Sequence, residues 1–349
     1  MSAKLRQEGE AQRPEPLRVT AIMPCYNGMG FLQRSLPPLL AMLGQDLLEV
    51  IVVDDGSSDG SGAYAAGEGA RVMTTGGREG PGAARNLAAR EAQGDVLLFV
   101  DADVVIHADA LGYVQSALAD PGVVAVFGSY DNQPPDAAFA SQYMNLRHHF
   151  VHHQHAGEAD TFWAGCGAVR RQAFLAVGGY DCVTYERPSI EDIELGYRLR
   201  AAGGRIALVP PMQGTHLKQW TLWGVVHTDI VCRALPWSRL LLSTPHANAA
   251  LNTRGGERAK AALAACFWLA LLLALVGAVD AWVPLLLFCA ALYTNRQLFA
   301  LFRRRRGWIF GLAGVLFHQL YYVYSTAAFV YAWLESRLHP QRTSGGSAA

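Results

Sequence analysis

The stretch Asp95-Val-Leu-Leu-Phe-Val-Asp101-Ala-Asp103 closes an apolar run with two carboxylates one residue apart. The run, 96–100, has the length and composition of a buried strand in a parallel sheet. Side chains two residues apart point the same way from an extended backbone, so Asp101 and Asp103 can converge on one point. Ligands of open α/β sheets bind at the carboxyl ends of the strands. The stretch predicts a ligand site, although the two aspartates taken alone also fit a solvated turn.

A divalent cation suits this pair of carboxylates. Mg²⁺ and Mn²⁺ prefer oxygen ligands and are commonly held by one or two carboxylates together with substrate phosphates. We therefore expect Mn²⁺ or Mg²⁺ as cofactor at Asp101 and Asp103, together with a ligand of the nucleotide type.

The surrounding sequence alternates between strand and helix patterns, which is typical of the α/β class. Strands are expected over 19–23, 48–54, 70–74 and 123–127, and helices over 31–43 and 83–93. Such alternation predicts right-handed crossovers and a mostly parallel sheet with helices on both faces. Three strand ends then deliver Tyr26, Asp55 and the aspartate pair to one edge.

The next part of the chain is less regular. Helices are expected over 139–153, 170–177 and 190–199, and an extended, glycine-containing segment over 161–167. Glu191 and Asp192 fall in the first turn of the last of these helices, where the helix dipole stabilises negative charge. This position gives both acids a structural explanation as well as a chemical one.

Composition separates the two ends of the chain. Of 349 residues, 51% are hydrophobic and 17% charged, and the apolar excess lies toward the C-terminus. The net charge is zero, so we expect no nucleic acid among the partners. The six cysteines are scattered without a C-x-x-C pair, which favours reduced thiols over a zinc site or disulfide framework. Residues 1–17 lack an apolar stretch and are expected to be a disordered lead-in rather than a signal peptide.

The C-terminal part has the pattern of a membrane region. Residues 220–258 are amphipathic, and Pro236 is expected to break or kink any helix there. Residues 259–336 are expected to form about three transmembrane helices, 261–279, 281–302 and 308–334, before a tail at 337–349. The second is the weakest because it contains Asn295 and Arg296. Basic residues at 254–260 and 303–306 predict a multi-pass protein of the inner (plasma) membrane with a cytosolic N-terminal domain and an external C-terminus.

Residues 18–219 resemble the GT-A catalytic domain of inverting glycosyltransferase family 2, of the membrane-anchored bacterial type. The resemblance is carried by five motifs in order: Met23-Pro24-Cys25-Tyr26-Asn27, Asp54-Asp55-Gly56-Ser57, Gly82-Ala-Ala-Arg85-Asn86, Asp101-Ala-Asp103 and Ile190-Glu191-Asp192-Ile193-Glu194.

The resemblance implies roles for individual residues. On the donor side it implies that the nucleotide sugar is bound by Pro24, Tyr26, Asn27, Asp55, Arg85, Asp101 and Lys218. It implies a metal site of Asp101 and Asp103, with His216 as a third ligand. On the acceptor side it implies Trp163, Gly165, Cys166, Glu191 and Trp220. Asp55 also fits a helix N-cap, and Arg85 a charge on a helix surface.

Inversion at an anomeric carbon requires a carboxylate that takes the proton of the attacking hydroxyl. Asp192 matches the base of the family. Glu191 and Glu194 have the same chemistry, and for these two the alternative is complementing the helix dipole.

The implied function is transfer of a single sugar from a UDP- or GDP-sugar to a lipid-linked or amphipathic acceptor at the cytosolic membrane face. One alternative is a non-catalytic sugar-nucleotide-binding subunit of a cell-envelope glycan assembly. A second is a processive polysaccharide synthase, but only Gln219-Trp220 remains of the Gln-x-x-Arg-Trp motif of such enzymes. A dinucleotide dehydrogenase would need Gly-x-Gly-x-x-Gly after the first strand, which Asn27-Gly28-Met29-Gly30 does not supply.

Five histidines cluster at 148–155. His148 and His152, and likewise His149 and His153, are four residues apart, a spacing at which two histidines on a helix can hold a metal. The alternative is a polar helix face near the acceptor cleft or the membrane surface.

Overall fold

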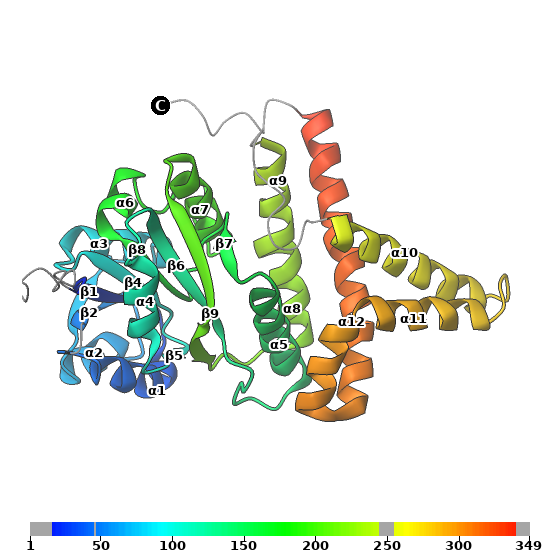
Figure 1. Cartoon of the computed structure of the whole chain (residues 1–349), viewed down its shortest axis with the longest axis horizontal. Helices are drawn as coiled ribbons and strands as arrows, with labels where there is room; N and C mark the ends of the chain where they lie inside the picture. Colours follow the sequence, from blue (N-terminus) through cyan, green and yellow to red (C-terminus); the bar gives the residue numbers. More distant parts are fainter. Residues whose placement is uncertain (1–15, 45–46, 244–254, 340–349) are drawn as a thin grey trace, which may run out of the picture.

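The computed structural model describes residues 16–44, 47–243 and 255–339, and its N-terminal part is a sheet with helices on both faces (Figure 1). The first half of this part comprises β1 (Val19–Cys25), α1 (Met29–Leu40), β2 (Leu47–Asp54), α2 (Ser61–Gly67), β3 (Arg71–Thr74), α3 (Pro81–Glu91), β4 (Val96–Val100), β5 (Val104–Ile106) and α4 (Ala110–Leu118). The second half comprises β6 (Val123–Tyr130), α5 (Phe139–Gln154), β7 (Gly157–Ala159), β8 (Cys166–Arg170), α6 (Arg171–Ala176), α7 (Glu191–Ala201) and β9 (Arg205–His216).

The sheet is parallel in its first half and mixed in its second. The strand order is β3-β2-β1-β4-β8-β6-β9-β5, with β7 paired to β9. β3, β2, β1 and β4 run parallel, as the alternating pattern predicts, whereas β8 is inserted antiparallel between β4 and β6. The antiparallel pairs were not expected. They bring β8 and β9 beside the carboxyl end of β4, which is where the site forms.

β9 is a long strand that the sequence analysis did not anticipate. It contains Pro210 and Pro211, which argue against a central strand because proline cannot donate to the ladder. Its parallel pairing with β6 is interrupted between Phe127 and Ser129, and the prolines fall in this irregularity. The backbones approach so closely there that a Cβ on Gly128 would overlap the carbonyl oxygen of Met212.

The apolar faces of the sheet form two cores. One lies under α1, α2 and α4 and the other under α3, α6 and α7. All five residues of β4 are buried, so the strand that carries Asp101 is fixed on both faces. A third apolar cluster joins α5 to the C-terminal helices through Tyr143, Phe302 and Val315.

The segment after β9 forms one helical run in three parts. α8 (Leu222–His227) leads into a π-helical turn, η1 (Thr228–Ala234), which continues as α9 (Leu235–Ser243). Pro236 was expected to break or kink a helix, but the helical run continues through it as α9. The wider turn just before it accommodates the missing N–H, with Leu235 N–H bonded to the carbonyl of Ile230.

The remaining helices differ from three separate spans. α10 (Gly255–Leu275) pairs with α11 (Trp282–Thr294), and α12 (Arg296–Leu338) follows after Asn295. The prediction of one helix over 281–302 is wrong, because α11 ends at Thr294 and the chain bends by 82° between α11 and α12. Gly307, with φ of 84°, interrupts α12. Among the described residues one helix, 256–275, is long and apolar enough to cross a membrane, or two if the bent pair α11 and α12 counts as one span.

Candidate functional site

A cavity of about 1370 Å³ lies at the carboxyl ends of β1 and β4 and extends beneath the C-terminal helices. Its sheet end is lined by Pro24, Tyr26, Asp55, Arg85, Asp101 and Asp103, and its middle by Trp163, Asp192, His216 and Arg233. Its far end is lined by residues of α9, α10 and α12. The structure thus brings most of the predicted site residues together in one space.

Asp101 is held by Arg85 from α3. Arg85 Nη2 lies 2.5 Å from Asp101 Oδ1, and the arginine is buried against Tyr180, whose ring centroid is 5.5 Å from the guanidinium. Burial opposes the charge of Arg85, but the Asp101 carboxylate, together with Tyr180, Glu191 and Asp192, outweighs it, so the pKa of Arg85 is raised. Arg85 is therefore not a helix-surface charge. It fixes one oxygen of Asp101 and leaves the other for the cavity.

Asp103 faces the end of β9. His216 Nε2 lies 3.5 Å from Asp103 Oδ2, and the imidazole stacks on Tyr130 with ring centroids 4.2 Å apart. β5 and β9 pair so that Val104 is opposite His216, which brings the histidine beside the aspartate. Burial works against ionisation of Asp103, but its contact with His216, together with the charge of Lys218, outweighs burial and lowers the pKa of the carboxyl.

These side chains fit part of a divalent-cation site. Asp101, Asp103 and His216 all line the cavity, and both carboxylate and imidazole are metal-ligand groups. In the described residues no three His, Cys, Asp or Glu side chains converge closely enough to hold a metal by themselves. A cation here would complete its shell with oxygens of a bound phosphate or water, as Mg²⁺ and Mn²⁺ commonly do.

Asp192 lies in the first turn of α7 and lines the middle of the cavity. Ala164 N–H donates to Asp192 Oδ2 at 3.2 Å, and Ile193 N–H donates to Oδ1 at 2.8 Å. Burial, and next the charge of Glu191, raise the pKa of Asp192 to about 7. A carboxylate with this pKa can accept a proton near neutral pH.

The neighbouring acids are engaged elsewhere. Glu191 lines the cavity, but its Oε2 accepts a hydrogen bond from the Ser189 N–H at 2.7 Å. This bond ties the carboxylate to the loop that precedes α7. Glu194 does not line the cavity. Both of its carboxylate oxygens bond Arg198 one turn further along the helix, at 2.6 Å each.

The residues after β1 and β2 support the loops around the sheet end of the cavity. Asp55 is buried and accepts three bonds from the glycine-rich loop before α3: from Thr75 Oγ1 at 2.8 Å, Glu79 N–H at 2.9 Å and Gly80 N–H at 2.8 Å. It is therefore not a helix N-cap. Asn27 bonds the 57–58 loop and is not part of the cavity wall, so its predicted donor contact lacks support here. Tyr26 is exposed beneath Arg78.

The predicted acceptor-side residues fall into two groups. Trp163, Gly165, Glu191 and Trp220 line the cavity, as does Lys218, whose ammonium lies 4.3 Å from the Trp220 ring. The expectation for Cys166 is wrong. It lies in β8 opposite Val100, fully buried and outside the cavity wall, and burial raises the pKa of its thiol to about 12.

The histidine-rich helix α5 runs along the cavity, and two of its histidines line it. His148 and His152 lie with ring centroids 4.1 Å apart and ring planes tilted by 52°, and both pack against Trp163. His152 Nδ1 lies 2.8 Å from the Gly128 carbonyl, and burial lowers the pKa of His152 to about 3. These neutral, packed rings fit a cavity wall better than a two-histidine metal site.

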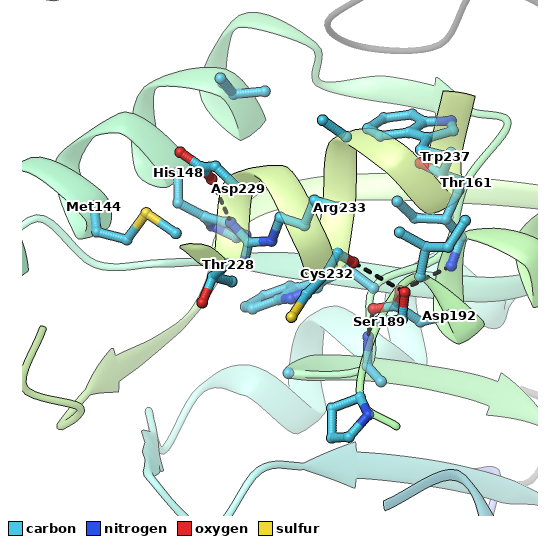
Figure 2. A pocket seen from close by; sticks show the side chains of 18 of the residues that line it. Met144, His148, Thr161, Ser189, Asp192, Thr228, Asp229, Cys232, Arg233 and Trp237 are labelled. Carbon is cyan, nitrogen blue, oxygen red and sulfur yellow. Dashed lines mark hydrogen bonds and ion pairs between the residues drawn. The ribbon is translucent and has the colours of Figure 1, made fainter. Parts of the chain in front are cut away.

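A charged cluster between α5 and η1 was missed in the sequence. Arg147 and Asp229 form a buried pair with two bonds of 2.7 Å, and Arg233 lies 3.6 Å from the same carboxylate. Figure 2 shows Asp229, His148 and Met144 on one side of the pocket, Arg233 in the middle, and Asp192 and Ser189 on the other. Because Arg147 already neutralises Asp229, Arg233 brings a surplus positive charge into the cavity. No local motif marks these residues; only the packing of η1 on α5 brings them together.

Residues 20–178 match the model of the family "Glycosyl transferase family 2". An uncharacterised glycosyltransferase of Haemophilus influenzae is 31% identical over 117 residues, 32% of this chain and 46% of that protein. A pre-mycofactocin glycosyltransferase of Mycobacterium tuberculosis is 29% identical over 224 residues, 59% of this chain and 45% of that protein. The chain thus spans about half the length of these curated relatives.

One solved structure resembles nearly the whole chain. It is a mannosyltransferase from Pyrobaculum calidifontis in complex with GDP-Man and Mn²⁺, with a TM-score of 0.58 and 20% identity. The match covers 91% of this chain and 88% of that one. At 20% identity, this likeness shows a shared fold and nothing about the substrate. Residues 20–178 are thus similar in sequence to glycosyltransferase family 2, and this part of the chain has the GT-A fold.

Proposed function

We propose that the protein transfers one sugar, with inversion, from a nucleotide-diphosphate sugar to a lipid-linked or amphipathic acceptor at the cytosolic face of the plasma membrane. The observation that carries the proposal is the single cavity that joins three parts: the aspartates after β4, Asp192 on α7 and the apolar wall of α10 and α12.

The donor occupies the sheet end of the cavity. The mannosyltransferase of similar fold is described with GDP-Man and Mn²⁺, which supports a nucleotide sugar and a divalent cation here as well. Asp101 and Asp103, with His216, would hold the cation. When bound, it would supply the positive charge that stabilises the departing diphosphate. Arg85 keeps Asp101 oriented.

Asp192 acts on the acceptor. It takes the proton of the acceptor hydroxyl as that oxygen attacks the anomeric carbon from the face opposite the departing nucleotide. The bonds from Ala164 and Ile193 fix the carboxylate, and its raised pKa makes it a stronger base than an ordinary aspartate.

The acceptor enters from the side of the C-terminal helices. Ala261, Ala262 and Ala265 of α10 and Phe329 of α12 line this end, an apolar surface that suits a hydrocarbon chain. Arg233 and Arg258 also line the cavity, so the acceptor is best matched by a lipid with an anionic group near the hydroxyl or phosphate that is glycosylated.

A transfer assay on detergent-purified full chain tests the proposal. UDP- and GDP-sugars are screened with Mn²⁺ or excess chelator, against a lipid phosphate acceptor and a water-soluble analogue of it. We expect metal-dependent transfer that favours the lipid. Donor binding without any transfer or hydrolysis across the panel would indicate a non-catalytic subunit, and long products from single enzyme encounters would indicate a processive synthase.

A further inference from the structure

The pair α10 and α11 forms an apolar hairpin that projects away from the rest of the chain (Figure 1). The two helices pack together, with the rings of Phe267 and Phe288 5.6 Å apart. Between Ala261 and Thr294 the only charged residue is Asp280, in the connection at the tip. Its outward surface is apolar and exposed at Leu269, Leu272, Leu275, Val276, Trp282, Leu285 and Leu286.

The hairpin has the dimensions of a bilayer insertion. At about 1.5 Å per residue, the 21 residues of α10 rise about 31 Å, close to the roughly 30 Å of a hydrocarbon core. The 13 residues of α11 rise about 20 Å on the way back. A surface that is apolar all round, rather than along one stripe, matches lipid better than a groove on another protein.

Both ends of the hairpin meet at one residue of α12. The hydroxyl of Tyr322 lies 2.7 Å from Glu257 Oε2, at the start of α10, and 3.3 Å from Asn295 Oδ1, just after α11. The chain therefore leaves the domain and returns to the same place.

α12 lies along the domain instead of leaving it. Arg306 donates to Gln142 at 2.7 Å, Tyr324 donates to Asp229 at 2.7 Å, and Arg239 pairs with Glu335 at 2.7 Å. These contacts are spread over almost 30 residues of the helix and connect it to α5, η1 and α9. A helix that crossed the bilayer would have to carry these charged partners into lipid with it, which is costly.

The other face of α12 suits the membrane surface. Leu312, Leu316 and Leu320 repeat every four residues and are exposed. The exposed Trp308 follows the four arginines at 303–306 along the chain. Tryptophan favours the interface between membrane and water, and arginine side chains there attract anionic phospholipid headgroups.

We infer that α10 and α11 enter the bilayer and return as one hairpin, while α12 lies on the membrane surface without crossing it. The catalytic domain, residues 303–306 and the C-terminus then share one side. This differs from the three-span expectation, which places the C-terminus on the opposite side. The inference concerns attachment and does not depend on which sugar or acceptor is used.

Topology reporters on the full chain give the first test. Alkaline phosphatase and green fluorescent protein are fused after Gly307 and after Ala349. We expect both positions to report the side of the catalytic domain. A C-terminal fusion on the opposite side would show that α12 crosses, and would overturn the inference.

Thiol labelling tests lipid burial without any need for activity. Cys266 and Cys289 are free and exposed on the hairpin. In sealed vesicles of phosphatidylethanolamine and phosphatidylglycerol, with the catalytic domain outward, a membrane-impermeant maleimide should leave both unmodified, as read by site-resolved mass spectrometry. It should modify a control Arg305→Cys, and all three should react once detergent dissolves the bilayer. Labelling of the hairpin thiols in intact vesicles contradicts insertion. Protection that persists in detergent together with a dimeric mass would identify a second copy, not lipid, as the partner.

A substitution pair isolates the hairpin surface. Leu272→Lys with Leu286→Lys should move the protein from the carbonate-washed membrane pellet to the supernatant, whereas Leu272→Ala with Leu286→Ala should leave it in the pellet. Both positions are exposed, so folding is preserved and is checked by unchanged nucleotide-sugar binding. A lysine variant that binds donor and stays in the pellet would refute the hairpin as the anchor.

Discussion

Arg85 Nη2 lies 2.5 Å from Asp101 Oδ1, so one of the two aspartates after β4 is paired with a buried arginine while the other faces a histidine. The two carboxylates of the motif are therefore not equivalent. Removal of Asp101 leaves the buried guanidinium of Arg85 without its charge partner, whereas removal of Asp103 leaves no buried guanidinium unpaired.

We predict that Asp101→Asn and Asp103→Asn both abolish metal-dependent transfer, but that only Asp101→Asn destabilises the fold. The expected loss is about 1–3 kcal/mol, below the roughly 3–5 kcal/mol of a fully buried pair because the Asp101 side chain is 34% exposed. Urea unfolding in detergent, with Mn²⁺ titrations of donor binding, measures both effects. Adding Arg85→Gln to Asp101→Asn should restore part of the stability, and equal stability losses in the two single variants would refute the asymmetry.

The raised pKa of Asp192 predicts a pH profile. Below a pH of about 7 the carboxyl is protonated and cannot act as a base, so the single-turnover rate should rise about tenfold per pH unit and level off above 7. The same pKa shift affects stability. Between pH 3.8 and about 7, Asp192 is protonated in the folded protein and ionised in the unfolded protein, so its contribution to the free energy of unfolding falls as the pH rises through this range.

Asp192→Asn should abolish the rising limb and lower the rate at least about a hundredfold, with donor affinity nearly intact. Glu191→Gln is the informative neighbour. The charge of Glu191 raises the pKa of Asp192, so its removal should shift the limb to lower pH and cost less rate. Glu194→Gln, which breaks only the bond to Arg198, serves as control. A larger loss in Glu191→Gln than in Asp192→Asn would assign the base elsewhere.

Arg233 is predicted to recognise an anionic group of the acceptor. Arg233→Gln should raise the KM for the lipid acceptor about tenfold or more, in line with the roughly 1.5–3 kcal/mol of a charge-assisted hydrogen bond. Donor hydrolysis without acceptor should stay unchanged, and so should all parameters of Arg90→Gln, an exposed arginine on α3 outside the cavity wall. A change in donor KM alone would place the donor diphosphate beside Arg233.

The pair of Arg147 and Asp229 is predicted to be a stability element. Its side chains are 9% and 2% exposed, so Asp229→Asn leaves a buried guanidinium without its charge partner and should cost about 3–5 kcal/mol. Tyr324→Phe removes one hydrogen bond to the same carboxylate and should cost about 1.5–3 kcal/mol, the usual range for a hydrogen bond to a charged group. Thermal unfolding in detergent compares the two. If both variants unfold alike, the ion pair does not hold η1 on α5.

Local patterns predicted the elements that are decided locally. The uninterrupted apolar run gave the strand at 96–100 that the structure has as β4, and the acids in the first turn of α7 were placed correctly. β9 was missed because its two prolines argue against a strand, and only its irregular pairing with β6 makes room for them. The sequence motifs singled out Asp101, Asp103 and Asp192, which the structure places on one cavity, and their chemical roles stay predictions. Arg233 and the wall of α5 depend on which helices pack together. Cys166 was misassigned because it is the first residue of β8 and its side chain packs in the core on one face of the sheet.

The cavity reaches α10 before that helix leaves the domain, so Glu257, Arg258 and Ala261 belong at once to the chamber and to the base of the hairpin. The anchor is thus not an interchangeable tail. A shortened chain ending at Ser243 would lose one wall of the chamber along with its attachment, and would be left open to water where the acceptor should lie. For the same reason, exchanging the hairpin for that of another protein would change which acceptor the cavity can bind as well as how the protein attaches to the membrane. The two properties share residues of α10, so one cannot be exchanged without altering the other.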